Sequence, residues 1–154
     1  MYFEDIPLGG KITLGSFNFT EENIIAFARQ FDPQPFHLDA AAAVNGPYGG
    51  LIASGWHTAA VWMKLMVANR RASEAMDGDV SQEDYLSPGT REMRWHLPVR
   101  PGLTLTYTTE AFNKRDWPSQ PRLGLLQSRN EARGPDEKLY YSFISQVFII
   151  RKPK

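Results

Sequence analysis

Hydrophobic positions along the chain follow two spacings, the alternation typical of strands and the three-to-four-residue interval typical of helices. Apolar and polar residues alternate between positions 12 and 20 with a change of phase near Gly15, which predicts a strand with a bulge. Residues 20–31 then carry an apolar stripe at helical spacing behind Thr20, a favourable N-cap. We therefore expect a helix that stops at Asp32–Pro33.

A second helix is expected to begin near Ser54, another favourable N-cap residue. The segment is apolar on nearly every side as far as Val67, which indicates that other structure surrounds this helix. The following residues, 70–87, are polar and lack an apolar period. They predict an excursion from the domain rather than a domain boundary.

The remaining apolar segments alternate as strands do, at residues 90–97, 103–112, 122–132 and 139–151. The last of them is apolar on both faces, so we expect a second layer to cover it. Together these patterns predict an α+β fold with a single domain over residues 1–154. In this fold a strongly curved antiparallel sheet wraps around the long central helix.

Composition narrows the class of protein. The chain has 154 residues, enough for one domain with a substantial core. The charges of its 17 basic and 17 acidic side chains cancel, which argues against a nucleic-acid partner. It contains no cysteine, which excludes disulfides, thiol nucleophiles and thiolate metal sites. No segment has signal-peptide character or approaches the roughly 20 apolar residues that span a bilayer. We therefore expect no membrane partner and a cytoplasmic location.

Candidate chemistry appears in the segment Asp32-Pro33-Gln34-Pro35-Phe36-His37-Leu38-Asp39, which places a carboxylate five residues before an imidazole. Its two prolines favour a rigid, exposed turn over a continuing helix. Asp and His held within reach of one reacting centre form a common acid–base pair. The alternative is an ordinary turn, with Asp32 as a capping residue and His37 as a surface histidine. Asp39 is expected to cap a short helix over residues 40–44.

The segment Gly49–Thr58 adds a possible anion-binding group. If Ser54 caps the second helix, Gly55 lies in the first turn, where backbone N–H groups lack partners and face the positive end of the helix dipole. Such an N–H could stabilise an oxygen that becomes negative. The glycines could equally serve only to let the backbone turn and pack closely. A phosphate-binding loop is excluded, because Trp56 and His57 occupy the places of its Lys and its Ser or Thr.

These segments resemble the signatures of the MaoC-like dehydratases, also called hydratase 2 or (R)-specific enoyl-CoA hydratases, which have a hot-dog fold. The family's Gly-Asp-x-Asn-Pro-x-His segment corresponds to residues 31–37, and its Gly-x-Ile-x-x-Gly segment to residues 50–55. A third block of similarity follows at residues 87–102. The resemblance runs from about residue 5 to the end of the chain and weakens after residue 112.

The chain departs from the family pattern at three positions. Gln34 replaces the usual Asn, Phe31 replaces the Gly before the aspartate, and Ser54 stands where many members have His. None of these changes removes Asp32 or His37. The two groups expected to perform the chemistry are therefore both present.

The resemblance implies an enoyl-CoA hydratase or 3-hydroxyacyl-CoA dehydratase of fatty acid metabolism, which adds water reversibly across the 2,3 double bond of an acyl thioester. Its catalytic residues would be Asp32 and His37 as the acid–base pair and Gly55 as the backbone donor to the thioester oxygen. Its substrate-binding residues would be Gln34, Phe36, Ser54 and Trp56. The reaction requires no cofactor and no metal, because a conjugated carbonyl already assists the hydration.

The resemblance also implies a homodimer, in which two sheets join edge to edge and the acyl-CoA pocket lies at the subunit boundary. Two other functions remain open, a hot-dog acyl-CoA thioesterase and a non-catalytic module that binds acyl thioesters. The hydratase is favoured over the thioesterase because the spacing from Asp32 to His37 matches it better.

Overall fold

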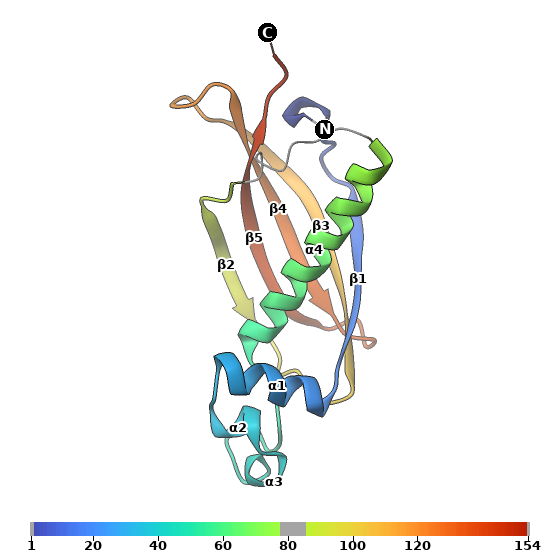
Figure 1. The fold of residues 1–154 in the computed structure, drawn as a ribbon, viewed down its shortest axis with the longest axis vertical. Helices are drawn as coiled ribbons and strands as arrows, with labels where there is room; N and C mark the ends of the chain where they lie inside the picture. Colours follow the sequence, from blue (N-terminus) through green and yellow to red (C-terminus); the bar gives the residue numbers. More distant parts are fainter. Residues whose placement is uncertain (1, 78–85, 154) are drawn as a thin grey trace.

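The computed structural model describes residues 2–77 and 86–153, which build one antiparallel sheet and one long helix with shorter helices at its end (Figure 1). The sheet has five strands, in the order β1 (Lys11–Phe19), β3 (Leu103–Asp116), β4 (Leu123–Arg133), β5 (Leu139–Ile150) and β2 (Gly89–Trp95). The helices are the 3-10 helix η1 (Phe3–Asp5) and the α-helices α1 (Glu21–Phe31), α2 (Pro35–Leu38), α3 (Ala40–Ala43) and α4 (Gly55–Asp77). Strands β1 and β2 are the two edges of the sheet.

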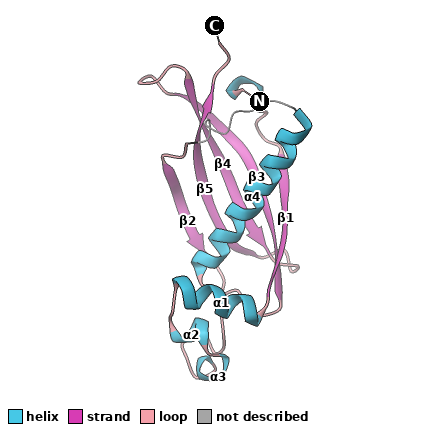
Figure 2. Cartoon of the chain, viewed as in Figure 1, coloured by secondary structure: helices cyan, strands magenta, loops and turns pink. Residues whose placement is uncertain are grey.

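Helix α4 lies along one face of the sheet, while α1, α2 and α3 gather at one end (Figure 1, Figure 2). The core lies between α4 and the sheet, where Trp62 packs edge-on against Phe143 of β5 with ring centroids 4.7 Å apart. Tyr107 of β3 is fully buried, and its hydroxyl donates to the Thr58 carbonyl of α4 at 3.1 Å. The predicted α+β arrangement, an antiparallel sheet around one long helix, is confirmed.

The first strand has the predicted bulge. The pairing of β1 with β3 shifts register between Thr13 and Gly15. Gly15 has a φ of 140°, which residues with a Cβ rarely adopt. A Cβ at this position would also lie 3.2 Å from Cδ2 of Leu65 in α4. Glycine at the bulge therefore lets the long helix approach the edge strand closely.

Helix α4 is longer than the sequence pattern predicts. We expected a polar excursion from residue 70, but the helix continues to Asp77, and residues 78–85 of that expected excursion lie outside the described residues. Residues 70–77 contain Arg, Ala, Glu and Met, which favour helix without any apolar period. No helix in the described part of the chain is both long and apolar enough to cross a membrane.

Two expected burial patterns are wrong for the single chain. Helix α4 is not enclosed on all sides, because Trp56 and Met63 are exposed. Strand β5 is not fully covered on both faces either, since Tyr141, Phe143 and Ile149 are buried while most residues between them are half-buried. One helix on one face of a sheet provides a single covered interface, which leaves these apolar surfaces partly open.

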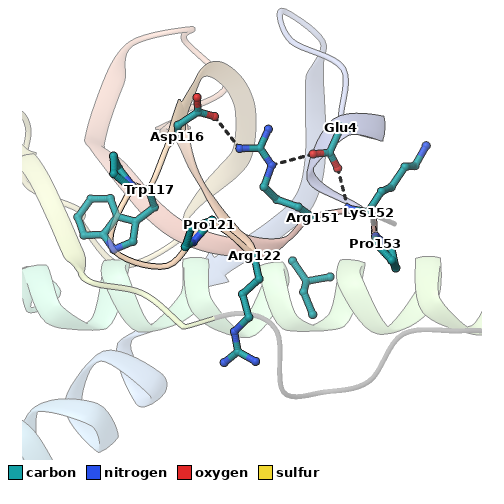
Figure 3. Close-up of a pocket in the computed structure, with 10 residues that line it drawn as sticks. Glu4, Asp116, Trp117, Pro121, Arg122, Arg151, Lys152 and Pro153 are labelled. Carbon is teal, nitrogen blue, oxygen red and sulfur yellow. Dashed lines mark hydrogen bonds and ion pairs between the residues drawn. The ribbon is translucent and has the colours of Figure 1, made fainter.

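The end of the sheet opposite α1 is closed by ion pairs that tie the two chain ends together (Figure 3). Arg151 donates to Asp116 at 2.6 Å and to Glu4 at 2.9 Å, and Glu4 also accepts from the Lys152 N–H at 3.0 Å. A hollow of about 880 Å³ lies beside this network, with Trp117 in its wall. Both acidic side chains of this hollow are paired with cations, so it is a weaker candidate for acid–base chemistry than the predicted site.

His57, in the first turn of α4, is buried in an aromatic cluster. Its ring stacks on Phe27 of α1 with centroids 4.6 Å apart and meets Phe17 and Phe19 of β1 edge-on. Its Nδ1 is buried and has no hydrogen-bond partner within the described structure. Burial lowers the pKa of His57 to about 4, because the imidazolium would be poorly solvated among these rings.

We expect His57 to make folding stability depend on pH between about 4 and 6.5. In the unfolded chain the His57 imidazole takes up a proton near its ordinary pKa of about 6.5. In the folded protein the same imidazole stays neutral until the pH falls to about 4. The unfolded state therefore binds more protons in this window, and the free energy of unfolding falls with falling pH by up to about 3 kcal/mol.

Urea denaturation at about pH 7 and about pH 4.5 measures this fall. It should be smaller in His57→Phe, which keeps an aromatic ring in the cluster but cannot take up a proton. An equal fall in the two proteins would show that the acid sensitivity arises elsewhere.

Candidate functional site

Asp32 lies where helix α1 ends. Its backbone N–H donates to the Ala28 carbonyl at 2.9 Å, and Pro33 prevents the helix from continuing. Only 17% of the Asp32 side chain is exposed. The local sequence therefore places a largely covered carboxylate at the point where the chain leaves the helix.

His37 lies in the short helix α2, which begins with Pro35. The expected turn is exposed at residues 33–35, but the expectation fails at His37, because helix α2 turns the imidazole inward and leaves 6% of its side chain exposed. Nδ1 lies 2.7 Å from the Ile52 carbonyl, so Nδ1 carries a hydrogen and donates it. Nε2 then faces Asp32 and lies 3.3 Å from Oδ2. His37 is therefore not a surface histidine.

Three side chains surround the Asp32 carboxylate. Ser54 Oγ donates to Oδ2 at 2.6 Å, Gln34 Nε2 donates to Oδ1 at 2.7 Å, and His37 is the third neighbour. Burial alone would raise the pKa of Asp32, but the hydrogen bonds from Ser54 and Gln34 and the charge of His37 outweigh it and lower the pKa. Asp32 is therefore ionised at neutral pH. No group of three or more potential metal ligands comes together among residues 2–77 and 86–153.

Helix α4 begins at Gly55, directly after Ser54. Ser54 Oγ accepts from the Trp56 N–H at 3.2 Å, and the Ser54 carbonyl accepts from the Thr58 N–H at 3.3 Å, as expected of an N-cap. The Gly55 N–H has no hydrogen-bond acceptor within the described chain. It lies at the positive end of a long helix and can therefore stabilise a negative oxygen.

Gly55 is held against Trp95 of β2. The indole Nε1 of Trp95 donates to the Gly55 carbonyl at 2.8 Å. A Cβ added to Gly55 would lie 2.6 Å from atoms of the indole ring, which is closer than van der Waals contact allows. The position therefore requires glycine because of this close approach.

These groups meet at a cavity of about 460 Å³. Its lining includes six of the seven predicted site residues, Asp32, Gln34, Phe36, His37, Gly55 and Trp56. Ser54 is the exception, because it does not line the cavity and is 0% exposed. Its hydroxyl contacts Asp32, and its expected role as a substrate-binding residue stays a prediction.

Sequence reasoning missed one wall of the cavity. That wall comes from the end of β2 and the residues after it, Trp95, His96, Leu97, Pro98 and Val99, together with Tyr48. These residues reach the site because β2 pairs with β5 at the edge of the sheet, a contact between segments far apart in the chain. The available signal was the third block of similarity at residues 87–102, which had no assigned role in the site.

Comparisons with known proteins show similarity over most of the chain. Residues 7–128 match the family model described as a MaoC like domain. The chain is similar to the MaoC-like dehydratase structure from Rhodospirillum rubrum, with 30% identity, a TM-score of 0.82 and coverage of 100% of this chain and 99% of that chain.

Two further relatives extend the comparison. The uncharacterized protein YdeM of Bacillus subtilis (strain 168) is 31% identical over 128 residues, which are 82% of each chain. The structure of the (R)-hydratase from A. caviae involved in PHA biosynthesis is similar in fold, with 22% identity, a TM-score of 0.70 and coverage of 97% of this chain and 99% of that chain.

Proposed function

This chain belongs to the MaoC-like family and has its hot-dog fold, and we propose that it is an enoyl-CoA hydratase or 3-hydroxyacyl-CoA dehydratase. The reaction is the reversible addition of water across the 2,3 double bond of an acyl thioester. One observation carries the proposal. His37 Nε2 lies 3.3 Å from Asp32 Oδ2 at a cavity that the Gly55 backbone also lines.

The proposed mechanism uses this chain's own side chains and backbone. Asp32, which is ionised, takes a proton from water as the water oxygen bonds to C3, and the Nε2–H of His37 supplies a proton to C2, so that the double bond is consumed. Because Nδ1 of His37 is bonded to Ile52, His37 exchanges its proton through Nε2. Negative charge that develops on the thioester oxygen is stabilised by the Gly55 N–H.

Two aromatic pairs support the binding of an acyl thioester beside these groups. Phe36 meets Tyr48 with ring centroids 5.3 Å apart, and Trp56 meets Trp95 at the same distance. All four line the cavity. We propose that Phe36 and Trp56 contact the substrate through these apolar walls. Gln34 lies at the exposed edge of the site.

Incubation of the purified protein with short and medium enoyl-CoAs tests the function directly. Loss of the conjugated double bond without release of free thiol supports the hydratase. Release of thiol would indicate the thioesterase, and binding without turnover would indicate the non-catalytic module. Either of these last two results would overturn the proposal.

We expect the protein to be a homodimer. Strand β2 is an edge of the sheet, and its last residue, Trp95, is exposed together with the neighbouring Trp56 and Leu97. An edge strand with exposed apolar neighbours favours pairing with another chain, and the interface should exceed about 1,000 Å². Light scattering at assay concentration should therefore give twice the mass of one chain. A stable and active monomer would contradict this expectation.

A further inference from the structure

Two of the three departures from the family signature contact the same carboxylate. Gln34, where the usual residue is Asn, donates to Oδ1 of Asp32 at 2.7 Å. Ser54, where many members have His, donates to Oδ2 at 2.6 Å. The third departure, Phe31, is exposed and packs on Phe27 instead. Each oxygen of Asp32 therefore has its own donor from a residue that differs from the family pattern.

The direction of the Ser54 bond follows from its second partner. The Trp56 N–H can only donate, and it donates to Ser54 Oγ at 3.2 Å. The Ser54 hydroxyl hydrogen is then available for Asp32, whose oxygen must accept it. Ser54 is 0% exposed, so water does not compete for this bond. The hydroxyl therefore joins the Asp32 carboxylate to the helix turn that begins with Gly55.

Gln34 holds the other oxygen from the solvent side. Its side chain is exposed, and its amide nitrogen donates to Oδ1. With a donor on each oxygen, the carboxylate cannot rotate without breaking a hydrogen bond to a charged group, and such bonds are stronger than neutral ones. His37 Nε2 meets the oxygen that Ser54 also contacts. The orientation of Asp32 relative to His37 is therefore determined by Ser54 and Gln34.

We propose that Ser54 and Gln34 act as a carboxylate clamp, a pair of positioning residues that hold Asp32 ionised and correctly oriented toward His37. This inference rests on the proposed function, because it assigns the two residues a role in the work of Asp32. Ser54 also aligns the carboxylate with the Gly55 N–H, since it contacts Asp32 and caps the helix in which Gly55 is the first residue. The clamp thus couples the base to the backbone donor.

The clamp should extend activity toward acidic pH. Hydrogen bonds to an ionised carboxylate favour the ionised form over the protonated form. The hydrogen bonds from Ser54 and Gln34 therefore contribute to the lowered pKa of Asp32. His37 of α2 lies 3.3 Å from Asp32, and the other titratable groups that line the same cavity are Tyr48 and His96. These groups are all retained when the clamp is removed. A change in the acidic limb of the pH profile of kcat can therefore be assigned to the lost donors, Ser54 and Gln34.

Ser54→Ala and Gln34→Ala test the clamp, with Ser145→Ala as a matched control. Ser145 is also a buried serine, but its hydroxyl accepts from Asn130 in the sheet and does not line the cavity. We expect each clamp variant to lower kcat by about tenfold, because a hydrogen bond to a charged group is lost. KM should not change in Ser54→Ala, since this side chain does not reach the cavity.

The second measurement does not depend on turnover. Carbon-13 NMR of the aspartate carboxyl groups, assigned with Asp32→Asn, follows the titration of Asp32 in each protein. The pKa of Asp32 and the acidic limb of the kcat profile should both move to higher pH in the two clamp variants and stay unchanged in Ser145→Ala. Because Gln34 is exposed, Gln34→Ala keeps the test available even if Ser54→Ala folds poorly.

The possible outcomes separate the two proposals. If the Asp32 titration is the same in wild type and both clamp variants, the clamp is wrong whatever the protein catalyses. If the titration moves but wild type converts no enoyl-CoA, the clamp exists and the proposed function is wrong. A loss of thermal stability with an unmoved acidic limb and unchanged kcat would show that Ser54 and Gln34 are merely structural, which also overturns the inference.

Discussion

Asp32→Asn and His37→Gln should each lower turnover on a short enoyl-CoA by about 10²- to 10⁴-fold, the usual effect of losing one general acid–base group. Asn keeps an oxygen that can accept from Ser54 but cannot take up a proton, and Gln keeps a polar amide without a titrating nitrogen. Because the two groups lie 3.3 Å apart and act as a unit, the double variant should be little worse than either single variant.

The matched control for this experiment is Asp39→Asn. Asp39 belongs to the same segment, but its carboxylate accepts from the Ala41 and Ala42 N–H groups as the N-cap of α3. Asn is an equally good N-cap, so this variant should retain both stability and turnover. Circular dichroism and thermal midpoints check folding. A folded Asp32→Asn protein that works at nearly the wild-type rate would exclude the mechanism.

Loss of the Gly55 N–H should lower kcat by about 10²- to 10³-fold, as expected for one donor to a developing oxyanion. A direct comparison of Gly55→Pro with wild type would be misleading, because any Cβ at this position meets the Trp95 ring. Both Gly55→Pro and Gly55→Ala are therefore best made together with Trp95→Ala. The two double variants each add a Cβ into the space of the removed indole, and only the proline variant lacks the N–H.

Proline is tolerated in the first turn of a helix, so the Gly55→Pro variant is expected to fold. The measurement is kcat at saturating enoyl-CoA for both double variants, with Trp95→Ala alone as the reference. Turnover in the alanine double variant should stay near this reference, while turnover in the proline double variant should fall. Equal turnover in the two double variants would mean that the thioester oxygen is stabilised by another group.

Several local features of the fold could be predicted because they depend on few neighbouring residues. Thr20 and Asp39 cap helices as expected, since the cap bond joins groups only two or three residues apart. The bulge at Gly15 and the helix end before Pro33 follow equally from local backbone restrictions. Helix α4 was predicted too short, because its polar final turns are helical through intrinsic propensity rather than through an apolar period.

The sequence by itself determined which groups were candidates for chemistry, because the types and spacings of Asp32, His37 and Gly55 are properties of the chain. Only the tertiary structure decided what surrounds them. Ser54 meets Asp32 through a hydrogen bond across 22 positions of sequence, and Trp95 packs on Gly55 across 40. Contacts of this kind depend on how α1, α4 and β2 pack together, and no local pattern of hydrophobic and polar residues records that packing.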